Sequence, residues 1–417
     1  MYKLDSKNYK FINELKKEDL YIINPSATTS TNLNKSGDII FESQQTSNPV
    51  DICNSFLRYE IEIKNTKVDD NMTLENNFFP NLFNSMRLTL GTHEIENIEN
   101  PGEISSMLNF ILITKSEKAK GEIIGWVPDK SYKEKDKNNK GFERRKTFYN
   151  NKTTFTGMFP LKHLFGFLES YNRLLFLMQI KLTLNGNIDD KKVFYGTKGE
   201  FKLEIKSLEF CMPELQLNPE YELELLNRIN TDKSIHVNYL NRLVNRIDIP
   251  KGSTYTWQPA LLNNKPRFIL LGFKNSDISY IRNNSKFIQH ISEEKDNTKI
   301  KYKIKSLRIK LNNSNYPINK MQFDITKNNQ IEPYLAYLKL CKTYKNKPQL
   351  NIMDFQKLYS IFCFDVSAQD EKLIINGCNV TIEIEKDSEL ICKGYCCILE
   401  EKEVEILIKG GKMYSIT

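Results

Sequence analysis

Alternation of apolar and polar residues is the dominant pattern of this chain. In the segment 56–63, the apolar residues Leu57, Tyr59, Ile61 and Ile63 are separated by single charged residues. A strand with one face buried and the other in water has this two-residue period. We expect further strands at 38–41, 85–90, 153–159, 175–184, 201–212, 235–241, 246–249, 254–257, 267–273, 306–311, 358–366, 380–385, 390–399 and 403–408.

Helical periodicity is confined to a few short segments. They are 103–114, 161–168, 220–229 and 331–342, and Pro219 stands at the start of the third, where proline favours a helix. Neither half of the chain shows the regular alternation of strands with long helices that a parallel α/β sheet needs. About eight short strands in each half predict an all-β protein with a few short helices, built from two-sheet sandwiches such as eight-stranded jelly rolls. Asn185-Gly186 is expected to close a hairpin.

One block of this pattern occurs twice. A strand, a turn and a later helical segment occupy 85–90, Gly91-Thr92 and 103–114 in the first half, and 306–311, Asn312-Asn313 and 331–342 in the second. The offset of 306 − 85 = 221 residues is about half of the 417-residue chain. Segment 161–167 is matched in the same order by 355–361. The sequence therefore predicts a tandem duplication of one domain.

Length and composition agree with two domains. A chain of 417 residues exceeds what one hydrophobic core usually organises, and 40% apolar with 27% charged residues is a globular composition. We expect an N-terminal arm and flexible joint at 1–37, in which the arm contacts a neighbour. We expect a first sandwich at 38–214, a connecting helix at 215–233 and a second sandwich at 234–417. The first sandwich has an inserted segment, 115–152, without a counterpart in the second.

The inserted segment 115–152 is rich in Lys and Arg. The net charge of +8 is modest for a chain of this length and does not by itself indicate nucleic-acid binding. Aromatic residues among the cations leave a nucleic-acid surface open, but acidic residues interrupt the run throughout, which favours a solvated loop that meets a neighbouring subunit. The aromatic residues are Trp126, Tyr132, Phe142 and Phe148. The candidate surface cations are Lys137, Lys140, Arg144, Arg145 and Lys146.

Patterns that carry catalysis or bind cofactors are absent from the sequence. It has no phosphate-binding Gly-rich loop followed by Lys-Ser/Thr, no Gly-X-Ser-X-Gly elbow and no His-Glu-X-X-His helix. The four histidines are widely separated. Cys392, Cys396 and Cys397 suggest zinc, but on one strand they alternate between opposite faces, which favours buried packing. We expect no enzyme, no cofactor and no metal site.

The sequence shows no pattern typical of secretion, membrane insertion or a disulfide framework. The first residues are polar and charged, without the apolar core of a signal peptide, and no apolar run is long enough to cross a bilayer. The eight cysteines do not have the spacing of a disulfide framework. These observations predict a protein made and kept inside a cell, without stable membrane insertion.

Several segments of the second half form a recognisable series. They are Thr254-Tyr255-Thr256-Trp257, 265–273 (Lys-Pro-Arg-Phe-Ile-Leu-Leu-Gly-Phe), 307–312 with Tyr316-Pro317, 364–371 (Phe-Asp-Val-Ser-Ala-Gln-Asp-Glu) and Tyr395-Cys396-Cys397-Ile398-Leu399. In this order they resemble segments of the major capsid proteins of Polinton-like elements and adintoviruses. They cover most of residues 250–400, whereas the first half is matched by layout more than by motif.

The resemblance implies a double jelly roll of the adenovirus hexon lineage. In such proteins three chains form a pseudo-hexagonal capsomer, and capsomers tile an icosahedral shell around double-stranded DNA. It therefore implies homotrimers, contacts with neighbouring capsomers, and a penton built from a single jelly-roll minor capsid protein. Contact with the encapsidated DNA would be indirect. The implied location is the virion, with assembly inside the host cell.

Two other interpretations remain open at this stage. A double jelly-roll scaffold protein of virion assembly would form the same trimer and be absent from mature particles. A basic β-sandwich that binds nucleic acid or glycans as a free module would bind as a monomer and in a salt-sensitive way.

Overall fold

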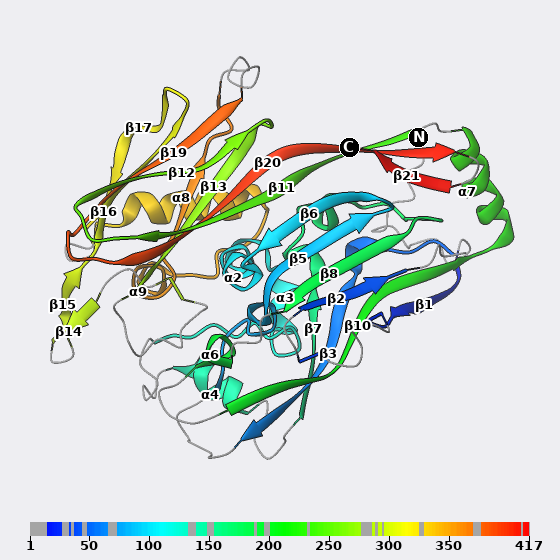
Figure 1. The fold of residues 1–417 in the computed structure, drawn as a ribbon, viewed down its shortest axis with the longest axis horizontal. Coiled ribbons are helices and arrows are strands. Elements are labelled where there is room, and N and C mark those ends of the chain that lie inside the picture. Colours follow the sequence, from blue (N-terminus) through cyan, green and yellow to red (C-terminus); the bar gives the residue numbers. More distant parts are fainter. Residues whose placement is uncertain are drawn as a thin grey trace.

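The computed structural model shows two β-rich lobes side by side (Figure 1). Long strands of the second lobe extend across the first. The structure describes residues 15–26, 33–34, 37–43, 48–65, 73–131, 139–147, 154–186, 190–195, 201–231, 234–276, 286–287, 291–293, 296–324, 329–369, 377–409 and 412–416.

The first lobe is a sandwich of two four-stranded antiparallel sheets. One sheet has the order β1 (Leu15–Ile23), β10 (Phe201–Leu217), β3 (Phe56–Asn65), β7 (Thr154–Pro160). The other has the order β2 (Gly37–Glu42), β8 (Ile180–Gly186), β5 (Phe83–Leu90), β6 (His93–Glu99). A short pair, β4 (Thr73–Leu74) and β9 (Phe194–Tyr195), lies apart from both sheets.

The second lobe repeats this arrangement. One sheet has the order β11 (Ser234–Ile249), β20 (Cys392–Lys409), β13 (Pro266–Asn275), β18 (Ile361–Asp365), with β21 (Lys412–Ile416) also paired to β20. The other has the order β12 (Thr254–Leu262), β19 (Cys378–Lys386), β16 (Ile304–Leu311), β17 (Ser314–Gln322). A separate hairpin consists of β14 (Ile291–Glu293) and β15 (Asp296–Tyr302).

The two sandwiches have identical strand topology. When the eight sandwich strands of each lobe are numbered in chain order, the two sheets read 1-8-3-6 and 2-7-4-5 in both lobes. Sheet partners that are distant in sequence are the mark of the jelly roll, which folds an antiparallel ribbon into two facing sheets. The prediction of two tandem eight-stranded jelly rolls is confirmed.

The block predicted to occur twice has the same structure in both lobes. β5, β6 and helix α2 (Pro101–Leu112) correspond to β16, β17 and helix α8 (Ile331–Thr343). The hairpin turns contain Gly91 with φ of 59° and Asn312 with φ of 51°, and these residues are 312 − 91 = 221 positions apart. Glycine and asparagine are the residues that adopt this left-handed conformation most readily.

The remaining helices are short and connect strands. The predicted helical segments 161–168 and 220–229 are confirmed, the first as a 3-10 turn followed by α5. No helix in the described part of the chain is long and apolar enough to cross a membrane. The helices are α3 (Lys115–Ala119), α4 (Lys140–Lys146), α5 (Gly166–Ser170), α6 (Asp190–Val193), α7 (Pro219–Thr231) and α9 (Ile352–Lys357), with 3-10 turns η1 (Ile52–Asn54), η2 (Phe79–Leu82) and η3 (Leu161–His163).

Two pairs of predicted strands are each one continuous strand. The segments 235–241 and 246–249 both belong to β11, and 390–399 and 403–408 fall largely within β20, which pairs with β11 over sixteen consecutive positions. The residues in both predicted gaps, 242–245 and 400–402, pair across this ladder instead. Asn241 donates to the Glu400 carboxylate at 2.8 Å, so the polar positions are satisfied without interrupting either strand.

Two further expectations are wrong. Asn185 and Gly186 do not form a hairpin turn, because they are the last residues of β8 and pair with β2. The segment 15–23, expected to be part of an arm on a neighbour, forms β1 and pairs with β10 of its own chain. Ile23 belongs to the core of the first sandwich, and Tyr21 packs against that core.

The hydrophobic core does not end at the boundary between the lobes. One cluster fills the second sandwich, whereas the other fills the first sandwich and continues into the second. Residues of the second lobe within this shared cluster include Tyr239, Tyr337, Tyr359 and Val404. The junction between the sandwiches is therefore continuous with the core.

Candidate functional site at the junction between the sandwiches

Helix α2 lies at the centre of the junction. All twelve of its residues are buried, and four of them are polar: Glu103, Ser105, Ser106 and Asn109. It contacts β5 and η2 of its own sandwich and α8 and β20 of the other (Figure 1). The helix therefore serves as core for both lobes.

The second sandwich also caps the C-terminal end of α2. The last four carbonyl groups of a helix have no partner within the helix and need other donors when they are buried. Here side chains from α8 and the loop after it supply these donors. The bonds are Gln349 Nε2 to Asn109 O (2.6 Å), Tyr337 Oη to Phe110 O (3.1 Å), and Asn346 Nδ2 to Ile111 O (2.9 Å) and Leu112 O (2.8 Å).

A buried carboxylate joins β6 to β11 on the other side of the junction. Glu96 accepts backbone hydrogen bonds from Gly166 (3.1 Å), Phe167 (2.8 Å) and Arg242 (3.2 Å), so one side chain holds α5 and β11 together. The Arg242 side chain, in turn, donates to Glu169 at 2.6 Å. Burial raises the pKa of Glu96 to about 7, although the Arg242 charge and the three donors act in the opposite direction.

The inserted segment is not the surface loop that its composition predicts. Its described parts, 115–131 and 139–147, contain α3 and α4, and Trp126 and Phe142 are buried in the protein. The Trp126 indole donates to Gln349 of the second sandwich at 3.1 Å. These aromatic rings serve packing, so they are not available to stack on nucleic-acid bases.

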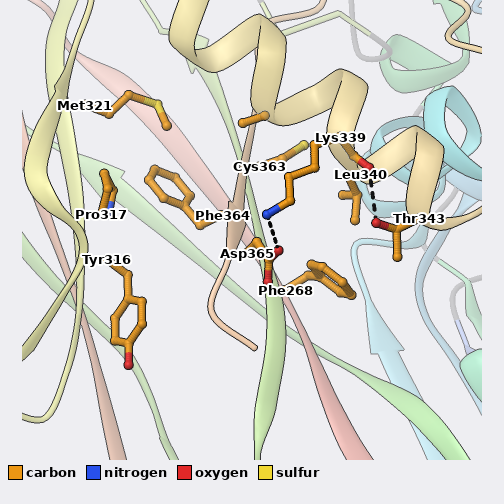
Figure 2. Close-up of a pocket in the computed structure, with 11 residues that line it drawn as sticks. Phe268, Tyr316, Pro317, Met321, Lys339, Leu340, Thr343, Cys363, Phe364 and Asp365 are labelled. Atoms are coloured by element: carbon orange, nitrogen blue, oxygen red, sulfur yellow. Dashed lines mark hydrogen bonds and ion pairs between the residues drawn. The ribbon is translucent and has the colours of Figure 1, made fainter. Parts of the chain in front are cut away.

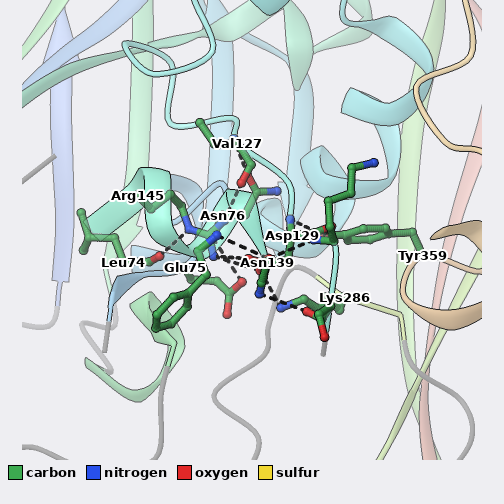
Figure 3. Close-up of polar contacts among 12 residues, drawn as sticks. Leu74, Glu75, Asn76, Val127, Asp129, Asn139, Arg145, Lys286 and Tyr359 are labelled. Atoms are coloured by element: carbon green, nitrogen blue, oxygen red, sulfur yellow. Dashed lines mark hydrogen bonds and ion pairs between the residues drawn. The ribbon is translucent and has the colours of Figure 1, made fainter. Parts of the chain in front are cut away.

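Arg145 was expected on the surface but lies in the interior (Figure 3). It donates to both carboxylate oxygens of Asp129, at 2.8 and 2.9 Å, and its side chain is 1% exposed. It also donates to the carbonyls of Leu74, at 2.8 Å, and Val127. Asp129 and Val127 belong to the same inserted segment and Leu74 belongs to β4, so the bonds join α4 to both; a buried guanidinium needs such a complete set of acceptors.

A second buried cation completes this cluster. Lys286 lies 2.6 Å from the Asp129 carboxylate and 3.9 Å from the centre of the Tyr195 ring. Burial alone would raise the pKa of Asp129, but Arg145 and Lys286 hold it below its ordinary value. The backbone of Asp129 also exchanges hydrogen bonds with the Tyr359 hydroxyl, at 2.9 and 3.2 Å. The cluster thus fastens the inserted segment to the second sandwich.

The other predicted cations lie elsewhere. Lys140 and Arg144 are exposed, one turn apart on α4, and Arg144 pairs with Glu122. Lys146 is half-buried with its amino group 5.8 Å from the centre of the Phe142 ring. Lys137 lies outside the described residues. The structure therefore leaves Lys140, Arg144 and Lys146 at the surface of α4 and places Arg145 on its inward face.

An apolar pocket of about 170 Å³ opens between α8, β17 and β18 (Figure 2). Phe268, Met321, Leu340 and Phe364 are among its lining residues, and an ion pair of 2.8 Å between Lys339 and Asp365 lies at its side. A cavity of this size accommodates one aromatic or branched aliphatic group.

The described residues offer little material for catalysis. They contain no group of three or more His, Cys, Asp or Glu side chains placed to hold a metal ion. Ser234, His236 and Glu403 are aligned in the order of a hydrolytic triad, at 3.4 and 2.7 Å, but His236 and Glu403 are more than half exposed. Water screens such an arrangement, and a catalytic triad needs a more enclosed site.

The cysteines behave as buried apolar residues. All eight are reduced and buried. Cys392 and Cys396 pack in the core of the second sandwich, whereas Cys397 points to the shared cluster on the other face of the sheet, as alternation along a strand requires. Burial raises the pKa of the Cys392 and Cys397 thiols to about 12, which disfavours the thiolate that zinc would need.

Comparison with known proteins agrees with this architecture. The model of the double jelly roll-like domain family matches residues 72–404. No curated protein sequence matches the chain.

Solved viral structures share the fold across nearly the whole chain. A chain in a structure of the Sputnik virophage is 11% identical with a TM-score of 0.64, and the match covers 97% of this chain and 89% of that one. The mavirus major capsid protein is 12% identical with a TM-score of 0.53, covering 95% and 90%. The Faustovirus major capsid protein is 8% identical with a TM-score of 0.53, covering 94% and 90%.

Proposed function

The chain belongs to the double jelly roll-like family, and we propose that it is a major capsid protein of a double-stranded DNA virus or virus-like element. The observation that carries the proposal is the exact repeat of one jelly-roll topology on both sides of a shared buried helix. Likeness over some nine-tenths of the mavirus and Faustovirus capsid proteins supports it.

Trimers are the assembly that this duplication favours. A ring of three chains contains six similar sandwiches, so a threefold oligomer presents a near-hexagonal outline. Such pseudo-hexagonal capsomers tile the flat faces of an icosahedral shell. A single jelly-roll penton protein occupies the vertices, and the enclosed DNA is contacted indirectly.

The junction suits a structural role more than a catalytic one. A shell subunit must keep its two lobes at a fixed angle, because any hinge between them would distort the hexagonal outline. Three separate features oppose such a hinge: the fully buried α2, the capping of its C-terminal end, and the buried ionic cluster around Asp129. The surface cations of α4, Lys140, Arg144 and Lys146, would face a neighbouring subunit in the virion.

Negative-stain electron microscopy of the purified protein tests the proposal. We expect particles with a hexagonal outline and, at high protein concentration, sheets or closed shells built from them. A protein that remains a monomer at high concentration would contradict the proposal.

A further inference from the structure

The junction inside the chain is a template for the contact between chains. At this junction β6, α2 and α5 of the first sandwich contact β11 and β20 of the second. Because the two sandwiches have the same topology, the four strands and α2 each have a counterpart in the other sandwich. The counterparts of β6 and α2 are β17 and α8, and those of β11 and β20 are β1 and β10. α5 lies between the sixth and seventh sandwich strands, where the described part of the second sandwich has no helix.

The surface of the second sandwich that corresponds to the first contacting face is exposed to solvent. β17 and α8 form this surface, named here the open face, and its large apolar residues are exposed. In the first sandwich, by contrast, α2 is fully buried and β6 buries Ile95 and Ile98. The exposed residues of the open face are Ile318 (83%), Ile331 (56%) and Leu335 (55%). Apolar residues clustered in this way mark an interaction site.

The apolar pocket adds a recess to the open face. It lies between β17 and the side of α8 that carries Ala336, Lys339 and Thr343, and Leu335 is one turn before Lys339 (Figure 2). Its volume is suited to one aliphatic or aromatic side chain of a partner.

The counterpart of the second contacting face lies on β1. In the first sandwich, β3 begins opposite Cys211 of β10, and Cys211 pairs on its other side with Ile22 of β1. In the second sandwich, β13 begins opposite Glu400 of β20, and Glu400 pairs on its other side with Asn241 of β11. Ile22 therefore occupies the position of Asn241. Two residues close to Asn241 bond to β6 at the junction within the chain. The Tyr239 hydroxyl donates to the Ile95 carbonyl at 3.1 Å, and the Arg242 backbone donates to the Glu96 carboxylate.

β1 carries apolar residues at these equivalent positions. Ile22 is 39% exposed, and its neighbours Leu20 and Tyr21 are half-buried. An apolar edge on one sandwich and an apolar face with a recess on the other are complementary surfaces. The junction within the chain pairs the other two surfaces, so this pair is left to meet between two copies.

From these matches, and resting on the proposed function, we infer that the open face docks on the β1–β10 edge of a second copy. The contact repeats the junction within the chain and is heterologous, since two different surfaces meet. Three such contacts close a ring in which contacts within and between chains alternate. Ile331 and Leu335 then lose their exposure to water on one side of the contact, and Ile22 on the other.

Two variants block the two sides separately. The double substitution Ile331→Lys with Leu335→Lys alters the open face, and Ile22→Lys alters the β1 edge. Leu261→Lys is the matched control, because Leu261 is 71% exposed on β12, at the opposite edge of the sheet that contains β17. Substitutions at exposed positions change folding stability little, and equal thermal unfolding of all variants checks this.

Light scattering after size-exclusion chromatography reads out the masses. We expect trimers for the wild type and for Leu261→Lys, and monomers for each face variant alone. Mixing the two face variants restores one intact contact, so it yields a dimer of one copy of each. This dimer distinguishes a heterologous contact from a symmetric one.

The outcomes separate the two proposals. A wild type that is monomeric at all concentrations would overturn the capsomer proposal and this contact together. Face variants that remain trimeric beside a trimeric wild type would overturn the contact alone. Monomeric face variants that form no mixed dimer would contradict the head-to-tail pairing.

Discussion

Arg145 and Asp129 form a two-bond ion pair in the interior of the protein, with side chains that are 1% and 0% exposed. Lys286 reaches the same carboxylate, and Tyr359 binds the backbone of Asp129 from the second sandwich. The inserted segment of the first sandwich is thereby fixed to the second. This makes the pair a sensitive point for the rigidity of the whole subunit.

Removing the buried cation should destabilise the protein strongly. Arg145→Met leaves the Asp129 carboxylate with one cation in place of two, and breaking a buried pair costs about 3–5 kcal/mol. Arg144→Met is the control, because Arg144 pairs with Glu122 at the surface and such pairs contribute about 1 kcal/mol or less. Urea unfolding at fixed protein concentration measures both. Equal losses would show that the buried pair has no special role.

Stability should depend on pH through Glu96. Its folded pKa of about 7 exceeds the ordinary 4.5, so the folded protein keeps a proton that the unfolded chain releases. Stability from this group is complete below pH 4.5 and falls as pH rises to 7, by about 3 kcal/mol in total.

Glu96→Gln should therefore remove this decline. The comparison is the free energy of unfolding of wild type and variant across pH 4.5–7, in which the difference between them changes steadily. Glu94→Gln, on the same strand but exposed, should run parallel to wild type. Parallel curves for Glu96→Gln as well would refute the role assigned to the buried carboxyl.

Asn346 should contribute to the connection between the sandwiches. Asn346→Ala leaves the carbonyls of Ile111 and Leu112 without this donor at the buried end of α2, at a cost of about 1–3 kcal/mol. The nearby exposed Lys347→Ala should have no measurable effect. Thermal unfolding should remain a single transition, because α2 belongs to the core of both lobes. Two separate transitions in the wild type would contradict a shared core.

The duplicated hairpin turn predicts which of two substitutions at Gly91 costs more stability. Gly91 has φ of 59°, and the equivalent residue of the second sandwich is Asn312 at 51°. Gly91→Ala should destabilise by about 1 kcal/mol because a β-carbon is strained in this conformation. Gly91→Asn should cost less, since asparagine already occupies this turn. Denaturant unfolding of the two variants decides the order, and an equal loss would argue against equivalent turns.

Much of the fold follows from local patterns in the sequence. Alternation such as that of Leu57, Tyr59 and Ile61 locates strands because each lies in a sheet with one buried face. The repeat of Gly91 and Asn312 at an offset of 221 residues identifies the two hairpins because the lobes share one topology. Each strand and each turn is recognised from a segment of a few residues, without knowledge of its partners in the fold.

The junction could not be predicted in this way because its partners are far apart in sequence. Arg145 looks like a surface cation beside Arg144 and Lys146, and its acceptors at Leu74 and Asp129 are brought to it only by folding. The available signal was Phe142, which lies three residues earlier and shares the inward face of α4.

The breaks that the strand prediction placed here have the same origin. Glu400 lies in the predicted gap between 390–399 and 403–408, but it pairs with Asn241 where the long strands cross the first sandwich. Polar residues in the middle of a strand thus marked the junction without identifying it.

The mass of the wild-type protein in solution tests the central claim most directly. Sedimentation equilibrium over a range of concentrations should give three copies of the 48.9 kDa chain as the stable species. A mass of one copy at every concentration would contradict an assembly built from trimeric capsomers.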